Sequence, residues 1–261
     1  MKTDNRPIGV FDSGVGGLTV LKECVEILPN ENYIYFGDIA NAPYGDKNKE
    51  DIISYVRAIT KFMKNNLVKA VVVACNTGCS CALDLIKKEY DFPIIGVIQP
   101  AVNEALKVSV NKKIALIATK ATVDSGSYKR AFDDYGIHNI KEIACRKFVP
   151  IIEKGFSEDE ISYAIKSDMN ELYGTDYDTL ILGCTHFPLI EDNIKKEFPN
   201  LIYVNPALNT ALELKKVLDG RDMLNNKREY IKIYYSKESD TLRKLGNEIA
   251  DNIEYNLIKI N

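Results

Sequence analysis

Two stretches decide the fold of this chain: Ala70-Val-Val-Val-Ala-Cys75-Asn76-Thr77 and Thr179-Leu-Ile-Leu-Gly-Cys184-Thr185-His186-Phe-Pro188. In each, an apolar run stops at a cysteine, a side chain that forms hydrogen bonds follows, and a helical pattern begins. This order predicts a strand-to-helix junction at the carboxyl end of a sheet, where α/β proteins bind their ligands. Two such junctions indicate two similar halves that face one site, with a thiol on each side.

The patterns around these stretches alternate between strand and helix. The expected strands are Ile8–Phe11, Tyr33–Phe36, Lys69–Ala74, Pro93–Ile98, Lys113–Ala118, Lys141–Ile143, Thr179–Leu182, Leu201–Val204 and Tyr230–Tyr235. The expected helices are Leu18–Leu28, Lys49–Asn65, 76–90, Ser125–Tyr135, Glu158–Leu172, the segment from Cys184 to Phe198, Thr210–Leu218 and Asp240–Ile249. Strands that alternate with helices favour right-handed βαβ units and a mostly parallel sheet.

The element order predicts an α/β protein with two pseudo-symmetric, three-layer domains and an active site in the cleft between them. A chain of 261 residues suits one large domain or two small ones. The pattern restarts near Gln99. We therefore expect a first domain of residues 1–98 plus 208–261 and a second domain of residues 99–207.

Charge and composition restrict the expected binding partners and the expected cellular compartment. The net charge is −3 and no basic stripe is present, so neither nucleic acid nor an anionic membrane is expected as a partner. Neither a secretory signal nor an apolar run of membrane-spanning length is found, which favours a cytoplasmic protein. The six cysteines do not resemble a disulfide framework and are expected to be free thiols.

Cys75 and Cys184 are the candidate reactive thiols. A thiol at a helix N-terminus faces the positive end of the helix dipole, which predicts a lowered pKa. His186 is suited to exchange a proton with Cys184, and Asp12 closes the first strand where a carboxylate points into the crevice. Either aspartate or serine at 12–13 also fits a helix N-cap. We expect the remaining cysteines to be packing residues and His138 to lie on the surface; these cysteines are Cys24, Cys79, Cys81 and Cys145.

Other motif assignments fit less well. The turn Gly14-Val-Gly-Gly17 lacks the full dinucleotide spacing and the Walker lysine. The cysteines lack a second pair at zinc-site spacing, so no metal is expected. A phosphatase would need an arginine shortly after Cys75. A hydrolase that uses Cys184 and His186 stays open, but it leaves Cys75 without a role.

Two activated thiols that face one pocket have a natural use in racemisation. One removes a proton from a carbon and the other returns a proton to the opposite face, so the stereocentre inverts without net oxidation and without a redox cofactor.

The chain resembles the glutamate racemases of the aspartate/glutamate racemase superfamily. The matching segments are Ile8–Leu21, Tyr35–Asp38, Ala42–Gly45, Ala74–Thr77, Phe148–Pro150 with Glu153, and Leu180–Pro188. The resemblance implies two α/β domains that hold glutamate between them without a cofactor, and often a homodimer. It also implies that the product, D-glutamate, supplies peptidoglycan synthesis and therefore cell-wall biogenesis and cell shape.

The resemblance also implies roles for individual residues. Cys75 matches the thiol that acts on D-glutamate, and Cys184 matches the thiol that acts on L-glutamate. Asp12, His186 and Glu153 match the catalytic assistants. The positions that match substrate-binding residues are Asp12, Ser13, Pro43, Tyr44, Gly45, Asn76, Thr77, Thr119, Thr122, Thr185 and His186.

The sequence departs from the family pattern at several positions outside the catalytic set: Gln99 and Ala101 replace the usual Glu and Gly, Ala118 replaces a Gly, Arg146 replaces a Pro, and Asn205-Pro206 replaces Asp-Ser. Gln99 and Asn205 lie near the expected hinge, so they bear on domain closure more than on chemistry. Three alternatives stay open: an aspartate or broad-specificity racemase, a cysteine hydrolase, and a binding protein on a racemase fold.

Overall fold

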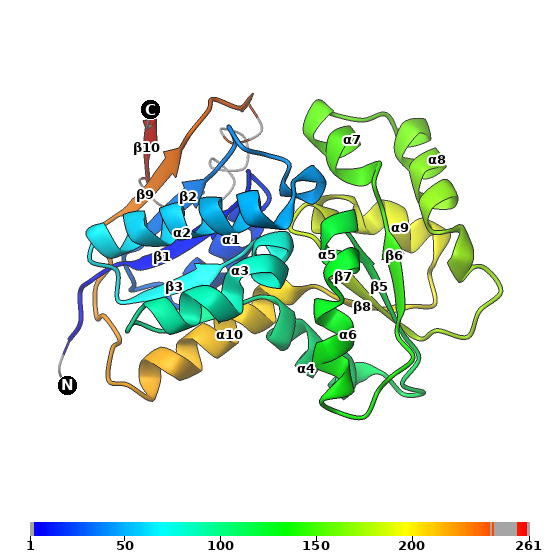
Figure 1. Ribbon diagram of the computed structural model, residues 1–261, viewed down its shortest axis with the longest axis horizontal. Helices are drawn as coiled ribbons and strands as arrows, with labels where there is room; N and C mark the ends of the chain where they lie inside the picture. Colours follow the sequence, from blue (N-terminus) through cyan, green and yellow to red (C-terminus); the bar gives the residue numbers. More distant parts are fainter. Residues whose placement is uncertain (1–2, 241, 243–254, 260–261) are drawn as a thin grey trace.

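The computed structural model describes residues 3–240, 242 and 255–259. In this part of the chain the strands form two sheets, and every strand pair is parallel (Figure 1). The six-stranded sheet has the order β10-β9-β2-β1-β3-β4, and the four-stranded sheet has the order β6-β5-β7-β8. The strands are β1 (Ile8–Asp12), β2 (Tyr33–Gly37), β3 (Ala70–Val73), β4 (Ile94–Gly96), β5 (Ile114–Ala118), β6 (Lys141–Ala144), β7 (Thr179–Gly183), β8 (Ile202–Val204), β9 (Ile231–Tyr235) and β10 (Tyr255–Lys259).

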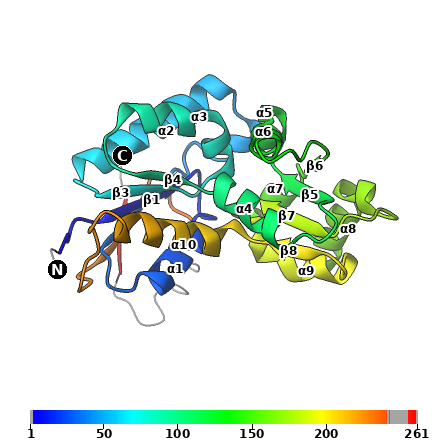
Figure 2. The ribbon, with the colours of Figure 1, turned by 90° about the horizontal axis from the view of Figure 1, so that it is seen from below.

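Helices cover both faces of the six-stranded sheet. Helices α1 (Leu18–Ile27) and α10 (Pro206–Asp219) pack together on one face, and α2 (Lys49–Asn65) and α3 (Asn76–Glu89) lie on the other (Figure 2). Helix α2 packs on the sheet through an apolar face, because Ile52, Val56 and Ile59 recur at helical spacing and are buried. Asn48 caps its first turn.

The four-stranded sheet is also flanked by helices. They are α5 (Lys120–Ser125), α6 (Ser127–Asp133), α7 (Phe148–Lys154), α8 (Glu158–Asp168) and α9 (Glu191–Glu197), with short 3₁₀ helices at Asn170–Leu172 and Phe187–Ile190. A third 3₁₀ helix, Tyr44–Asp46, lies between β2 and α2. Helix α8 begins with a capping box between Ser157 and Glu160. Two α/β units with parallel sheets confirm the predicted fold class.

Helix α4 (Ile98–Val108) connects the two sheets and was not expected. The apolar pattern predicts a strand at Pro93–Ile98, but β4 spans only Ile94–Gly96. Pro100 lies in the first turn of α4, where a proline costs no helical hydrogen bond. Helix α4 packs against α10 and α6, so the largest buried apolar cluster extends from the first sheet to one face of the second.

Other expected elements differ in extent. The helix expected at Ser125–Tyr135 is shorter and corresponds to α6, whereas α5 was expected to be a turn. The two helices meet at Gly126, whose φ of 62° lies in the left-handed region. The helix expected at Glu158–Leu172 ends at Asp168. Most of the helix expected at Asp240–Ile249 lies outside the described residues, and β10 was not expected. Among the helices of the described chain, none is both long and apolar enough to cross a membrane.

Candidate active site

One narrow cavity lies between the carboxyl ends of the strands of both sheets. Strands β1 and β3 are neighbours in the first sheet, and β5 and β7 are neighbours in the second. The residues that line the cavity are Ser13, Ala42, Pro43, Tyr44, Gly45, Cys75, Asn76, Thr77, Thr119, Val149, Glu153, Cys184, Thr185 and His186. Of the residues expected in the site, only Asp12 and Thr122 do not line the cavity, and both form hydrogen bonds with residues that do.

Cys75 follows β3 and is the N-cap residue of α3. Its Sγ accepts a hydrogen bond from the Gly78 N–H at 3.3 Å and donates to the Ser13 hydroxyl at 3.5 Å. The helix N-terminus predicts a lowered pKa for Cys75, and that prediction is wrong. Burial and the nearby Asp12 carboxylate raise the pKa of Cys75 well above its ordinary value, and they outweigh the two hydrogen bonds. Cys75 therefore stands as a protonated thiol.

Asp12 is completely buried under the glycine-rich turn of residues 13–17. The Gly14 and Gly17 N–H groups both donate to its Oδ2 at 3.1 Å, and the Thr185 hydroxyl donates to Oδ1 at 3.4 Å from the second sheet. Burial raises the pKa of Asp12 even though His186 and these N–H groups lower it. The Asp12 carboxyl is therefore held firmly in place by donors from both halves.

The glycines in this turn serve close packing. A Cβ on Gly16 would lie 2.5 Å from the Thr185 hydroxyl and 2.8 Å from His186 Nδ1. A real Cβ does not approach other atoms that closely. The turn therefore lets the first half approach Thr185 and His186 of the second, and nucleotide binding is not needed to explain it.

Cys184, His186 and Glu153 form a chain of polar contacts in the second half. His186 Nδ1 lies 3.9 Å from Cys184 Sγ, and His186 Nε2 lies 3.0 Å from Glu153 Oε1. Burial alone lowers the pKa of His186, but the hydrogen bonds to Cys184 and Glu153 and the charge of Asp12 raise it to about 10. His186 is therefore an imidazolium at neutral pH, and it can stabilise a thiolate on Cys184.

Three threonine hydroxyls from the two halves meet at one corner of the cavity. Thr77 Oγ1 lies 2.9 Å from Thr119 Oγ1 and 3.2 Å from Thr122 Oγ1, and the last two lie 3.0 Å apart. Thr77 belongs to α3, whereas Thr119 caps α5. Hydroxyls that are clustered in this way are suited to donate to a carboxylate.

The loop that carries Pro43, Tyr44 and Gly45 is fixed by a hydrogen bond from Tyr44 to Asp38. The Tyr44 hydroxyl donates to Asp38 Oδ2 at 2.7 Å, and Asn41 and Ser236 donate to the same carboxylate. The Tyr44 hydroxyl is therefore used inside the protein. Asp38 belongs to one of the matching sequence segments, but its contact with Tyr44, six residues away, was not predicted.

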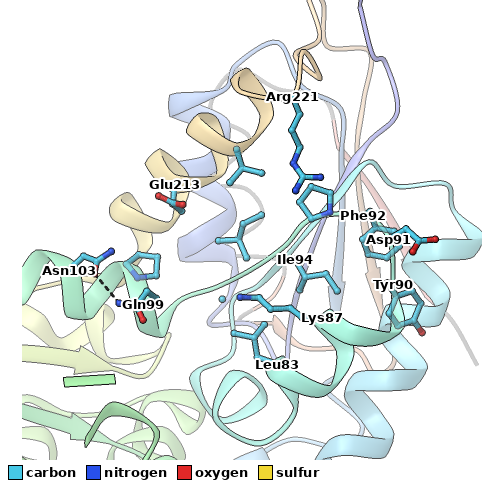
Figure 3. Close-up of a pocket in the computed structure, with 15 residues that line it drawn as sticks. Leu83, Lys87, Tyr90, Asp91, Phe92, Ile94, Gln99, Asn103, Glu213 and Arg221 are labelled. Carbon is cyan, nitrogen blue, oxygen red and sulfur yellow. Dashed lines mark hydrogen bonds between the residues drawn. The ribbon is translucent and has the colours of Figure 1, made fainter. Parts of the chain in front are cut away.

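A much larger hollow of about 480 Å³ lies beside the C-terminal half of α3, away from the thiols (Figure 3). Its charged residues are of both signs, Lys87 and Arg221 against Asp91 and Glu213, and no cysteine or histidine lines it. The reactive thiols and the histidine therefore line the narrow cavity and not this larger hollow.

The remaining cysteines and the second histidine lie outside the cavity. Cys24, Cys79 and Cys145 are buried as expected, but Cys81 is only half-buried. All six cysteines are free, which confirms the expectation of free thiols. His138 is exposed and contacts Asp133, as predicted for a surface residue.

Comparison with known proteins identifies the family to which the chain belongs. Residues 8–211 match the family model described as Asp/Glu/Hydantoin racemase. The chain belongs to this racemase family. It is 42% identical over 266 aligned residues to the glutamate racemase of Thermoanaerobacter pseudethanolicus, with 98% of this chain and 99% of that protein covered.

Solved racemase structures have the same fold. A glutamate racemase isoform from Bacillus anthracis matches with a TM-score of 0.93 and 31% identity, covering 99% of this chain and 98% of that one. The glutamate racemase of Francisella tularensis, solved in complex with D-glutamate, matches with a TM-score of 0.91 and 33% identity over the same shares.

In this member of the racemase family, Glu153→Gln should lower the pKa of His186. The neutral amide removes a carboxylate that raises this pKa, so we expect a decrease of about 1 unit. The chain has only two histidines, so an NMR titration of labelled histidine gives two resolvable curves. The exposed His138 is the internal control, and its curve should not move.

The same shift has a consequence for stability. The folded-state pKa of His186, about 10, lies above its ordinary value of 6.5. Its contribution to the free energy of unfolding is therefore complete below pH 6.5 and is lost as the pH rises through about 10. Glu153→Gln should reduce this alkaline loss. An unchanged His186 titration would show that Glu153 does not set its charge.

Proposed function

We propose that this chain is a glutamate racemase that interconverts L-glutamate and D-glutamate with two thiols and no cofactor. The observation that carries the proposal is that Cys75 and Cys184, from the carboxyl edges of two facing sheets, line the same cavity. Each thiol has its own partners: Ser13 and Asp12 beside Cys75, and His186 beside Cys184. A hydrolase would leave one of these two built sites idle.

We assign the thiols to opposite faces of the substrate. Cys184, as a thiolate beside the His186 imidazolium, removes the α-proton of L-glutamate. Cys75, whose raised pKa keeps it protonated, then donates a proton to the other face to give D-glutamate. One proton leaves carbon and one returns, so no electron acceptor is required. In the reverse direction the thiols exchange roles, and Asp12 takes the proton of Cys75.

The remaining lining residues are assigned to substrate binding. The hydroxyls of Thr77, Thr119 and Thr122 and the Asn76 side chain offer hydrogen-bond donors to a carboxylate. Ser13, Thr185 and the loop of residues 43–45 form the rest of the cavity wall. The cavity is narrow, about 20 Å³, which is room for roughly one water. The two halves must therefore separate slightly for glutamate to enter.

The test is optical. Purified protein without added cofactor is incubated with D-glutamate and, separately, with D-aspartate, and the optical signal of each is followed toward zero. Decay with glutamate alone is expected. Decay with both would favour a broad-specificity racemase, and decay with aspartate alone would favour an aspartate racemase.

A double variant, Cys75→Ser with Cys184→Ser, purified in the same way, controls for contaminating racemase. Should neither amino acid lose its optical signal, α-proton exchange with D₂O separates the remaining readings. Exchange of the α-proton without racemisation would support proton removal by a thiol. If no α-proton exchange occurs, the hydrolase or binding-protein alternatives are favoured.

The cellular setting is also a proposal. We infer that the enzyme works in the cytoplasm, which is supported by its six free thiols, and that its D-glutamate enters peptidoglycan. A strain without the gene should then need external D-glutamate. We further propose a homodimer, testable by sedimentation, and domains of residues 1–98 plus 208–261 and 99–207; the strands of the four-stranded sheet all fall within the second range.

A further inference from the structure

A hydrogen bond joins the two halves directly behind the cavity. Tyr128 lies in α6 of the second half and is completely buried. Its hydroxyl donates to Oδ1 of Asn76, the first residue of α3, at 2.6 Å. Within the described residues this is the one partner of the Tyr128 hydroxyl. A buried hydroxyl in this position acts on Asn76 alone.

This bond fixes which end of the Asn76 carboxamide faces the cavity. A carboxamide carries an acceptor oxygen and a donor NH₂ group on opposite sides. Because Tyr128 occupies the oxygen, the NH₂ group is turned the other way, and Nδ2 has no partner among the described residues. Asn76 lines the cavity next to Cys75. The free donor is therefore available to a substrate carboxylate.

We propose that Tyr128 is a positioning residue of the racemase, which keeps the Asn76 NH₂ group directed at a carboxylate of the substrate. This inference rests on the proposed function. Without the hydroxyl, the carboxamide can rotate by 180° and present its oxygen, which repels a carboxylate. The bond also crosses between the halves, so it forms only when they are closed around the site.

A second buried tyrosine provides a matched control. Tyr33 is as completely buried as Tyr128, but its hydroxyl donates to the backbone oxygens of Cys24 and Leu28, at the end of α1. It contacts no residue of the cavity through these bonds. Tyr33→Phe therefore measures the cost of a lost buried hydroxyl without any change at the site.

The first experiment compares the steady-state kinetics of Tyr128→Phe and Tyr33→Phe with glutamate. We expect Tyr128→Phe to raise KM about tenfold, the equivalent of one hydrogen bond, with kcat within about threefold of the original. Tyr33→Phe should lower the melting temperature but leave KM unchanged. An equal KM in all three proteins would overturn the assignment.

A double-mutant cycle shows whether Tyr128 acts through Asn76. In an Asn76→Ala background, Tyr128→Phe should change KM by less than about twofold, because the group that it orients is already gone. A full tenfold effect in that background would sink the proposal. Asn76→Asp, which leaves Tyr128 intact, should raise KM at least as much as Asn76→Ala, since an oxygen then faces the substrate carboxylate. A smaller rise would count equally against it.

The unaltered protein separates this inference from the proposed function. If it racemises glutamate and Tyr128→Phe has an unchanged KM, only the positioning role is wrong. If it does not racemise glutamate, the proposed function and the role of Tyr128 both fail.

Discussion

Cys75→Ser and Cys184→Ser are each expected to lower kcat for racemisation by about 10³-fold or more and to leave the fold intact. Serine keeps the shape of cysteine, but its hydroxyl is far less acidic, so it neither removes the α-proton nor stabilises the resulting charge. In the proposed mechanism both thiols are needed in each turnover, because one takes a proton and the other gives one. Cys81→Ser is the matched control: this thiol is half-buried, lies outside the cavity, and should keep full activity.

Exchange of the α-proton with D₂O distinguishes the two thiols. In Cys75→Ser, Cys184 still reaches its own face, so L-glutamate should exchange faster than D-glutamate. Cys184→Ser should reverse this preference. Proton NMR follows the loss of the α-signal for each enantiomer separately. If both variants lose exchange equally from both enantiomers, the division of labour between the thiols is wrong.

The two strand–cysteine junctions were predictable because each is written in a short, continuous run. The apolar stretches before Cys75 and Cys184 form β3 and β7, and both thiols reach the cavity. Helices α4 and α7 were not predicted. Each has a proline near its start, Pro100 in α4 and Pro150 in α7. A proline usually argues against a helix, although the first helical turn accepts it.

The charge state of the site was less predictable than its membership. The helix N-terminus at Cys75 predicted a lowered pKa, but burial and Asp12, 63 residues earlier in the sequence, raise it. Tyr128 likewise donates a hydrogen bond to Asn76, which lies 52 residues earlier in the sequence, and no local pattern reveals this contact. The sequence identifies the reactive side chains, whereas the fold determines their protonation state and orientation.

Lys69 is a further residue whose environment the sequence did not reveal. It precedes β3 and was expected to be the first residue of that strand. In the structure it is fully buried, and its Nζ lies 2.5 Å from Glu31 Oε2. The ammonium group also donates to the backbone oxygens of Asp4 and Met223. It thus connects the N-terminal segment, the first sheet and the segment after α10.

Lys69→Met is expected to lower the free energy of unfolding by about 3–5 kcal/mol, because it leaves the Glu31 carboxylate buried without its partner. Urea unfolding followed by circular dichroism measures this change. The remaining folded protein should keep its kcat, because Lys69 and Cys75 lie at opposite ends of β3.

The double variant Lys69→Met with Glu31→Leu separates the cost of a stranded charge from the value of the pair. When both charges are replaced by apolar groups, no buried carboxylate is left unpaired, and most of the lost stability should return. A double variant as unstable as Lys69→Met alone would mean that the hydrogen bonds it lacks carry the stability. These are the bonds from the ammonium group to Asp4 and Met223 and the bond from the Asn225 N–H to Glu31. The charge pair of Lys69 with Glu31 would then be secondary.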